Sequence, residues 1–153
     1  MPQRTEELIE QFATEHDQVR RVLAQLRTTA DLVAADPGSP ECVSAVRDIH
    51  TQFVDQVLPH EQAEEQRLYP SLAEALGTAE ATAPMSRTHV EIHRLVDRID
   101  GHLHRVSDSR FPTDLVPDLL ATLYGLDAVL RLHLVQEEED FFSLASAERS
   151  AAS

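Results

Sequence analysis

The chain has 153 residues, 42% of them hydrophobic, and a formal net charge of -14 at pH 7. This length suits one domain with its own core, and the negative charge without a Lys/Arg cluster argues against binding to nucleic acid or to an anionic membrane. The single cysteine excludes an internal disulfide, and no apolar run reaches transmembrane length or follows the N-terminus as a leader, so we expect a cytoplasmic protein.

Apolar residues in the first half of the chain recur at helical spacing and predict two helices. The first extends from about residue 5 to 35, and Asp36-Pro37-Gly38 ends it. Ser39 and Pro40 begin the second helix as N-cap and first helical residue. It continues to about residue 69, with a kink expected at Pro59 because proline removes one backbone hydrogen bond, and a last turn or two after Pro70 ends near Gly77.

Two further helices are predicted in the second half. Pro84 opens the third, which carries apolar residues as far as Val106, and a loop follows over residues 107–112. The fourth begins between Thr113 and Pro117. We expect residues 1–145 to form one all-α domain, an antiparallel up-down-up-down four-helix bundle, and residues 146–153 to form a flexible tail.

Histidines and glutamates occupy core-facing positions in all four predicted helices. His16 lies alone on the first helix, and the other helices each carry two such residues four positions apart, which places both on one face. In this topology the three pairs meet at one end of the bundle, close to the level of His16. We therefore expect seven side chains in one layer: His16, His60, Glu64, His89, His93, His133 and Glu137.

Such a layer is best explained by a metal site. The alternative is a metal-free polar core, in which each unpaired buried group costs on the order of 1–3 kcal/mol. Nitrogen and carboxylate ligands without thiolate favour iron or manganese over structural zinc. Seven ligands exceed one octahedron, so they predict two metal ions, one with an open position. An apolar surround suits dioxygen, hydrogen peroxide or nitric oxide better than an organic substrate.

The same residues resemble the hemerythrin-like (HHE cation-binding) family over about residues 10–142. The resemblance rests on His16, His60-x3-Glu64 followed by Leu68-Tyr69-Pro70, Thr88-His89-x3-His93, and His133-x3-Glu137-Glu138. It implies a four-helix bundle with two iron ions in an oxo- or hydroxo-bridged di-iron centre. It also implies terminal ligation by His16, His60, His89, His93 and His133, with Glu64 and Glu137 as bridges. Replacing His93 with Ala should then abolish binding of two irons.

One position departs from the oxygen-carrying members of that family, which usually place an Asp five residues after the last histidine. Here Glu137 follows His133 by four residues and Glu138 by five. The helix seam favours Glu137, and Glu138 is the alternate ligand. Glu61 and Glu65 are expected to be solvated or to support the ligands.

The departure widens the range of expected functions. We expect a non-haem di-iron protein that binds or senses dioxygen or decomposes hydrogen peroxide. The alternatives are iron storage or donation and handling of nitric oxide or oxidative stress. Whether the protein is an enzyme, with catalase-like or nitric oxide activity, stays open at this point. Any redox role needs a reductant supplied by another molecule.

Overall fold

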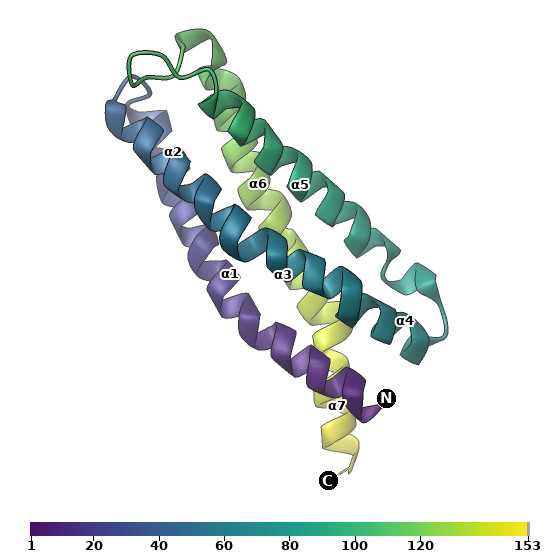
Figure 1. Ribbon diagram of the computed structural model, residues 1–153. Coiled ribbons are helices and arrows are strands. Elements are labelled where there is room, and N and C mark those ends of the chain that lie inside the picture. Colours follow the sequence, from purple (N-terminus) through teal and green to yellow (C-terminus); the bar gives the residue numbers. More distant parts are fainter. Residues whose placement is uncertain (153) are drawn as a thin grey trace.

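The protein folds as four antiparallel helical segments packed side by side (Figure 1). The computed structural model describes the backbone of residues 1–152 and their side chains except 146–149 and 152. Each segment contacts its two neighbours, which confirms the predicted all-α bundle. The segments in chain order are α1 (Gln3–Ala35); α2 (Pro40–Gln52), η1 (Phe53–Val57), α3 (Leu58–Ala63), η2 (Glu64–Leu68) and α4 (Tyr69–Leu76); α5 (Ala83–Leu103); and α6 (Val116–Glu137), η5 (Glu138–Phe142) and α7 (Ser143–Ala152).

Two prolines explain why the second segment changes its helical winding. A proline ring clashes with the carbonyl of the residue four positions earlier, and a wider π turn relieves this clash. The residue before Pro59, Leu58, donates its N–H to the carbonyl of Phe53, and the residue before Pro70, Tyr69, donates to Glu64. At Pro59, where a kink was expected, the helix continues through a π turn. No proline accounts for the third π turn, η5.

Helix ends follow the sequence signals closely. Ser39 caps α2 through its hydroxyl, which accepts from the N–H of Glu41, with Pro40 at the first helical position. Gly77 ends α4 in the left-handed region at φ 74°, where a glycine is favoured. Short 3-10 turns stand in the two later connections, η3 (Ala79–Ala81) and η4 (Thr113–Leu115). Helix α5 ends at Leu103 rather than at Val106.

The fourth segment extends beyond the boundary that the sequence indicated. We expected a flexible tail over residues 146–153; helix α7 continues through Ala152, which leaves the flexibility untested, and Ser153 lies outside the described residues. The N-terminus and the end of α7 lie at the same end of the bundle (Figure 1). No helix in the described part of the chain is long and apolar enough to cross a membrane.

The core consists of two apolar clusters with a polar layer between them. The larger cluster fills the bundle from the α1–α2 connection to Val57, Ile92 and Leu134. The smaller one, at the end that holds the termini, includes Phe12 and Leu68. Buried histidines and glutamates separate the two clusters, and all of them except Glu61 occupy helix positions that the apolar repeat had placed on the seam. The packing on both sides fixes where these polar side chains lie.

Candidate metal centre

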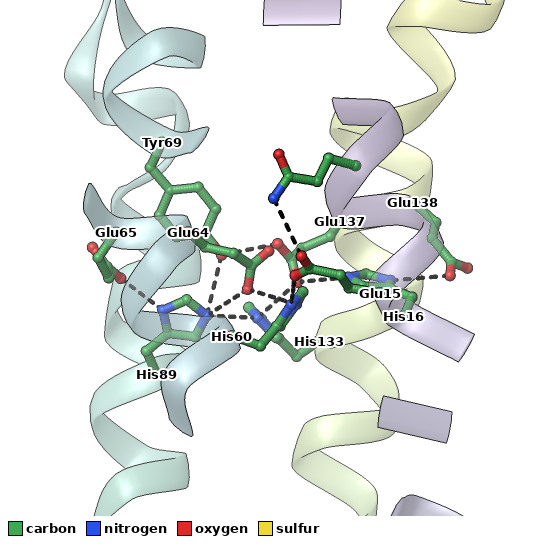
Figure 2. Close-up of polar contacts among 11 residues, drawn as sticks. Glu15, His16, His60, Glu64, Glu65, Tyr69, His89, His133, Glu137 and Glu138 are labelled. Atoms are coloured by element: carbon green, nitrogen blue, oxygen red, sulfur yellow. Dashed lines mark hydrogen bonds and ion pairs between the residues drawn. The ribbon is translucent and has the colours of Figure 1, made fainter. Parts of the chain in front are cut away.

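Six polar side chains from all four segments converge in the layer between the apolar clusters (Figure 2). The structure describes all six side chains, and each of them is buried. They are His16 from α1, His60 from α3, Glu64 from η2, His89 from α5, and His133 and Glu137 from α6. These are six of the seven side chains that the sequence had placed in one layer.

The six side chains form two groups. Within each group, the donor atoms lie within 4.8 Å of one another. One group consists of Glu64, His89, His133 and Glu137, and the other of His16, His60 and Glu64. Glu64 belongs to both groups, because its Oε1 lies 3.3 Å from Nε2 of His60 and 3.4 Å from Nε2 of His89. The layer therefore holds two adjoining sets of donors that share a carboxylate.

Glu137 approaches both groups in the same way. Its Oε1 lies 2.9 Å from Nε2 of His133 and 3.6 Å from Nε2 of His16. Each of the two carboxylates thus faces one histidine from either side of the layer. This is the arrangement that two bridging carboxylates require.

Several of the facing atoms have no hydrogen-bond partner. They are Nε2 of His16, Nε2 of His60, both carboxylate oxygens of Glu64 and Oε1 of Glu137. Buried polar atoms in native proteins are nearly always paired, and leaving one unpaired costs about 1–3 kcal/mol. A cation would turn these lone pairs into bonds, so the donor set fits a metal site.

Burial shifts several of these side chains toward their uncharged forms. Burial, then the neighbouring charge of His133, lowers the pKa of His89 to about 4. Burial also lowers the pKa of His60. Both imidazoles are therefore neutral at physiological pH, each with a nitrogen lone pair. Burial, then the proximity of Glu137, raises the pKa of Glu64 well above its usual range, so a cation must displace its proton.

Carboxylates outside the layer hold three of the four histidines. Nδ1 of His60 donates to Glu15 at 2.8 Å, and Nδ1 of His89 donates to Glu65 at 2.7 Å. Nδ1 of His16 lies 3.2 Å from Glu138. Such partners fix the ring and leave Nε2 as the ligand atom. His133 differs, because its buried Nδ1 has no hydrogen-bond partner.

The Tyr69 hydroxyl also reaches the cluster. It donates to Oε2 of Glu137 at 3.0 Å and lies 3.2 Å from Nε2 of His89 (Figure 2). Its side chain packs in the smaller apolar cluster. Tyr69 therefore closes that cluster and holds the oxygen of Glu137 that faces away from His133.

Glu138 lies beside the cluster rather than in it. Its side chain is 35% exposed and pairs with His16 and Arg20, whereas Glu137 is fully buried among the donors. The geometry therefore favours Glu137 over the alternate ligand Glu138. The apolar seam of the helix favoured Glu137 for the same reason, since one further residue turns the side chain by about 100°.

The structure does not bring His93 to the cluster. Its side chain is 60% exposed, and its Nδ1 lies 3.5 Å from Asp97 one turn later. Helix α5 buries Met85, His89 and Ile92, so the inward stripe passes through Ile92 and leaves His93 on the outer side. The expected layer of seven thus contains six side chains in this structure.

Sequence reasoning missed Glu15 altogether. Glu15 does not fall on the apolar repeat of α1 and lies one position from His16. The sequence therefore indicates a solvated residue. The available signal is its neighbourhood, because a carboxylate next to a ligand in sequence can reach a ligand on the next helix. Glu65 after Glu64 and Glu138 after Glu137 repeat this relation, and for Glu65 a supporting role was among the expectations.

Comparison with known families decides the assignment. Residues 7–145 match the Hemerythrin HHE cation binding domain. The chain belongs to this family. The match covers almost all of the four-helix bundle and every residue of the buried cluster. No curated protein and no solved structure matches the chain significantly.

Membership in the HHE family agrees with the donor set. The domain is a cation-binding one, and the two adjoining groups supply residues able to hold a metal. The other histidines lie outside these groups. His102 donates to Asp118 near the opposite end of α5, and His50 lies 3.8 Å from Asp100. The one cysteine, Cys42, is buried at the start of α2 and is not among the donors.

Proposed function

We propose that this HHE protein holds two iron ions and acts on dioxygen or hydrogen peroxide. The observation that carries the proposal is the pair of adjoining donor groups that share Glu64 and contain buried atoms without hydrogen-bond partners. The six donors fall into two groups that share only Glu64, and one ion in either group would leave donors of the other unused. Two ions bridged by Glu64 and Glu137 use every donor.

The ligand types favour iron. Four imidazoles and two carboxylates without thiolate suit iron or manganese, whereas structural zinc prefers four ligands and often cysteine. Each ion would receive two histidines and a share of two carboxylates, which leaves positions open on an octahedral metal. A pair of iron ions, when bound, supplies redox chemistry toward dioxygen and peroxide.

The apolar side chains on one side of the layer favour a small molecule as the exogenous ligand. The ring of Phe142 packs on His16 at 4.7 Å between centroids, and that of Phe12 packs on His60 at 5.5 Å. These rings and Leu68 leave an apolar wall on the side of the termini. Such a wall shields this side of the layer from water and bulky substrates, which supports a ligand as small as a diatomic molecule or peroxide. Electrons for a redox cycle would come from a separate reductant.

An iron-handling role is the second candidate. It is favoured by an open groove beside His89, which Glu61, Glu65 and Asp97 also line, because storage or donation requires ions to exchange with solvent. Nitric oxide would fit the same small apolar site as dioxygen. The candidates differ in what the loaded protein does: a carrier or sensor releases dioxygen unchanged, an enzyme turns over peroxide, and a storage protein yields its iron to a chelator.

Metal stoichiometry tests the proposal first. Metal-free protein is titrated anaerobically with Fe(II), desalted and assayed by elemental analysis, with two irons expected per chain. Glu64→Gln should hold fewer than two, because it removes the shared charge. His104→Ala, at the residue that follows α5 and is exposed and outside the cluster, is the matched control and should hold two.

Reactivity then separates the candidates. The di-iron protein is exposed to dioxygen and to hydrogen peroxide, and consumption of each is followed with an electrode. Dioxygen that returns under vacuum would identify a carrier or sensor, and sustained loss of peroxide would identify an enzyme. One zinc per chain, or no metal after anaerobic reconstitution, would overturn the di-iron proposal.

A further inference from the structure

Helix α6 exposes apolar side chains on the face that points away from the core, between its neighbours α1 and α5. Leu132 and Val135 are 57% and 42% exposed there, and their spacing of three residues places them side by side. The other large apolar side chains that the described residues expose are Val54, Leu76 and Val90, each on a different element. Single exposed residues need no explanation, whereas an apolar patch indicates an interaction surface.

Small residues continue this face toward the start of α6. Ala121, Gly125, Ala128, Leu132 and Val135 follow one another at alternating spacings of four and three residues, and together they form the outer seam. Such spacing is typical of a helix that packs along another helix. The inner side of α6 already packs in the core. Helix α6 therefore has a second apolar face, which the described part of the chain leaves largely exposed.

Gly125 is the member of the outer seam that the fold of one chain does not require. It lies in the middle of α6, where a glycine destabilises a helix relative to alanine. Its φ is not in the left-handed region, and a Cβ added here would meet nothing within 4 Å. A glycine on a helix surface allows another backbone to approach closely. The outer seam thus suits a partner helix.

Charges border the outer seam and differ between its two ends. Glu139 extends the seam by one turn and is exposed. Near the opposite end, Arg98 donates two hydrogen bonds to Asp118 at 2.7 Å, and its side chain is 49% exposed. Arg131, beside the seam, donates to Asp127 at 2.8 Å. The middle is therefore apolar, one end is negative, and the other offers a partly exposed cation.

We propose that two copies of this chain pair through the outer seam, with their α6 helices antiparallel. The large residues of the seam occupy its C-terminal half and the small ones its N-terminal half. Because Ala128 lies midway, an antiparallel pair centred there places Val135 of one copy opposite Ala121 of the other. Leu132 then lies opposite Gly125 to within one residue. Each large side chain meets a small residue, so both halves pack closely in a two-fold symmetric contact.

The charges favour the same orientation. Glu139 follows Ala128 by eleven residues, so in the antiparallel pair it faces the start of α6 in the second copy, where Arg98 is exposed. A parallel pair would instead bring the two Glu139 side chains together, and like charges repel. The inner side of α6, which carries His133 of the buried cluster, takes no part in this contact. The pairing is therefore separate from the proposed function.

The oligomeric state of the full-length chain tests the pairing. Sedimentation at increasing protein concentration and physiological ionic strength should show a monomer–dimer equilibrium. Leu132→Arg and Gly125→Arg should each raise the dissociation constant by at least about tenfold, because they place a charge in the centre of the contact. Gly125→Arg also introduces a better helix former, so a weakened helix cannot explain the loss. Each variant makes the net charge less negative, which by itself lowers the repulsion between copies.

Gly101→Arg is the matched control. Gly101 is an exposed glycine of α5 that also has open space around its Cα and lies outside the seam, so this variant should keep the wild-type dissociation constant. A wild-type chain that stays monomeric at every concentration would overturn the pairing and leave the outer seam to a different protein. A dimer that persists unchanged in Leu132→Arg and Gly125→Arg would overturn the use of this face.

Oxidative cross-linking tests the orientation. Ala128→Cys lies at the centre of the antiparallel contact and should form a disulfide-linked dimer. Ala121→Cys should not, because Val135 of the second copy lies opposite it. The native Cys42 is buried and does not compete. Efficient cross-linking of both variants would overturn the antiparallel arrangement, since equivalent residues meet along the whole seam only in a parallel pair.

Discussion

Glu15 of α1 and His60 of α3 are joined across the helix interface, with Oε2 of the carboxylate 2.8 Å from Nδ1 of the ring. This contact fixes the proton on Nδ1 and turns the lone pair of Nε2 toward Glu64. The ring therefore needs no rearrangement before it binds a cation. Glu15 has the same relation to His60 as Glu65 has to His89, so each of the two donor groups has a supported histidine.

Removing this support should weaken one metal position. Glu15→Ala is expected to lower the affinity for one of the two ions by about 10- to 100-fold, since partners of ligating histidines contribute this much. Competition with a chelator of known affinity measures both ions separately. Glu7→Ala, two turns earlier on α1, is the control and should leave both unchanged. An equal loss at both positions would mean that Glu15 acts through the fold and not through His60.

Metal binding should release a proton from Glu64. Burial and Glu137 raise the pKa of this carboxyl, so it is protonated in the metal-free protein at pH values where an ordinary glutamate is ionised. A cation binds the ionised form, and apparent affinity should therefore rise with pH. Calorimetric titration in two buffers of different ionisation enthalpy counts the released protons. Glu64→Gln should release fewer; equal proton release in this variant would assign the proton elsewhere.

The apolar repeats were enough to predict the bundle, its topology and most of the metal cluster. His16, His133 and Glu137 occupy seam positions, and helical spacing alone places them in the core. Two of the π turns also have a cause in the sequence, namely Pro59 and Pro70. The sequence predicted a kink at Pro59 and did not predict a π turn. In each case the signal is local, because backbone sterics and burial act over a few residues.

Other parts of the site depend on how neighbouring helices meet. The i,i+4 spacing of His89 and His93 predicted one shared face, but α5 is rotated so that Ile92 packs inward and His93 lies at the groove. Glu15 has no periodic signal, because its partner His60 lies on another helix. Such contacts depend on how far each helix is rotated about its own axis relative to its neighbour. The apolar repeat of a single helix does not specify this rotation closely enough to predict them.

At the opposite end of the bundle, Asp118 should stabilise the fold modestly and only above acidic pH. Two hydrogen bonds from Arg98, then one from His102, lower the pKa of Asp118 to about 2. A lowered carboxyl pKa contributes stability that is present above about pH 4 and is lost as the pH falls through about 2. Asp118→Asn should therefore cost at most about 1 kcal/mol at pH 7, because the pair is partly exposed.

Urea denaturation of the metal-free protein at several pH values measures this difference. The gap between wild type and Asp118→Asn should close on acidification from pH 4 toward pH 2. Asp114→Asn, which removes a more exposed partner of Arg105, is the comparison and should change stability less. A gap that persisted at pH 2 would assign the effect of Asp118 to something other than its charge.

Tyr69 should stabilise the metal-free protein more than it affects metal content. Its hydroxyl donates to the buried Oε2 of Glu137, so Tyr69→Phe leaves that oxygen without its donor at a cost of about 1–3 kcal/mol. Chemical denaturation without metal measures the loss, and elemental analysis should still find two irons because the hydroxyl is not among the donors. Tyr124→Phe is the matched control, since that hydroxyl donates to Asp31 at the surface and its removal should cost little. Equal losses of stability in the two variants would show that the buried hydrogen bond from Tyr69 to Glu137 contributes no more than the surface one from Tyr124. Loss of iron in Tyr69→Phe would make the hydroxyl part of the metal site.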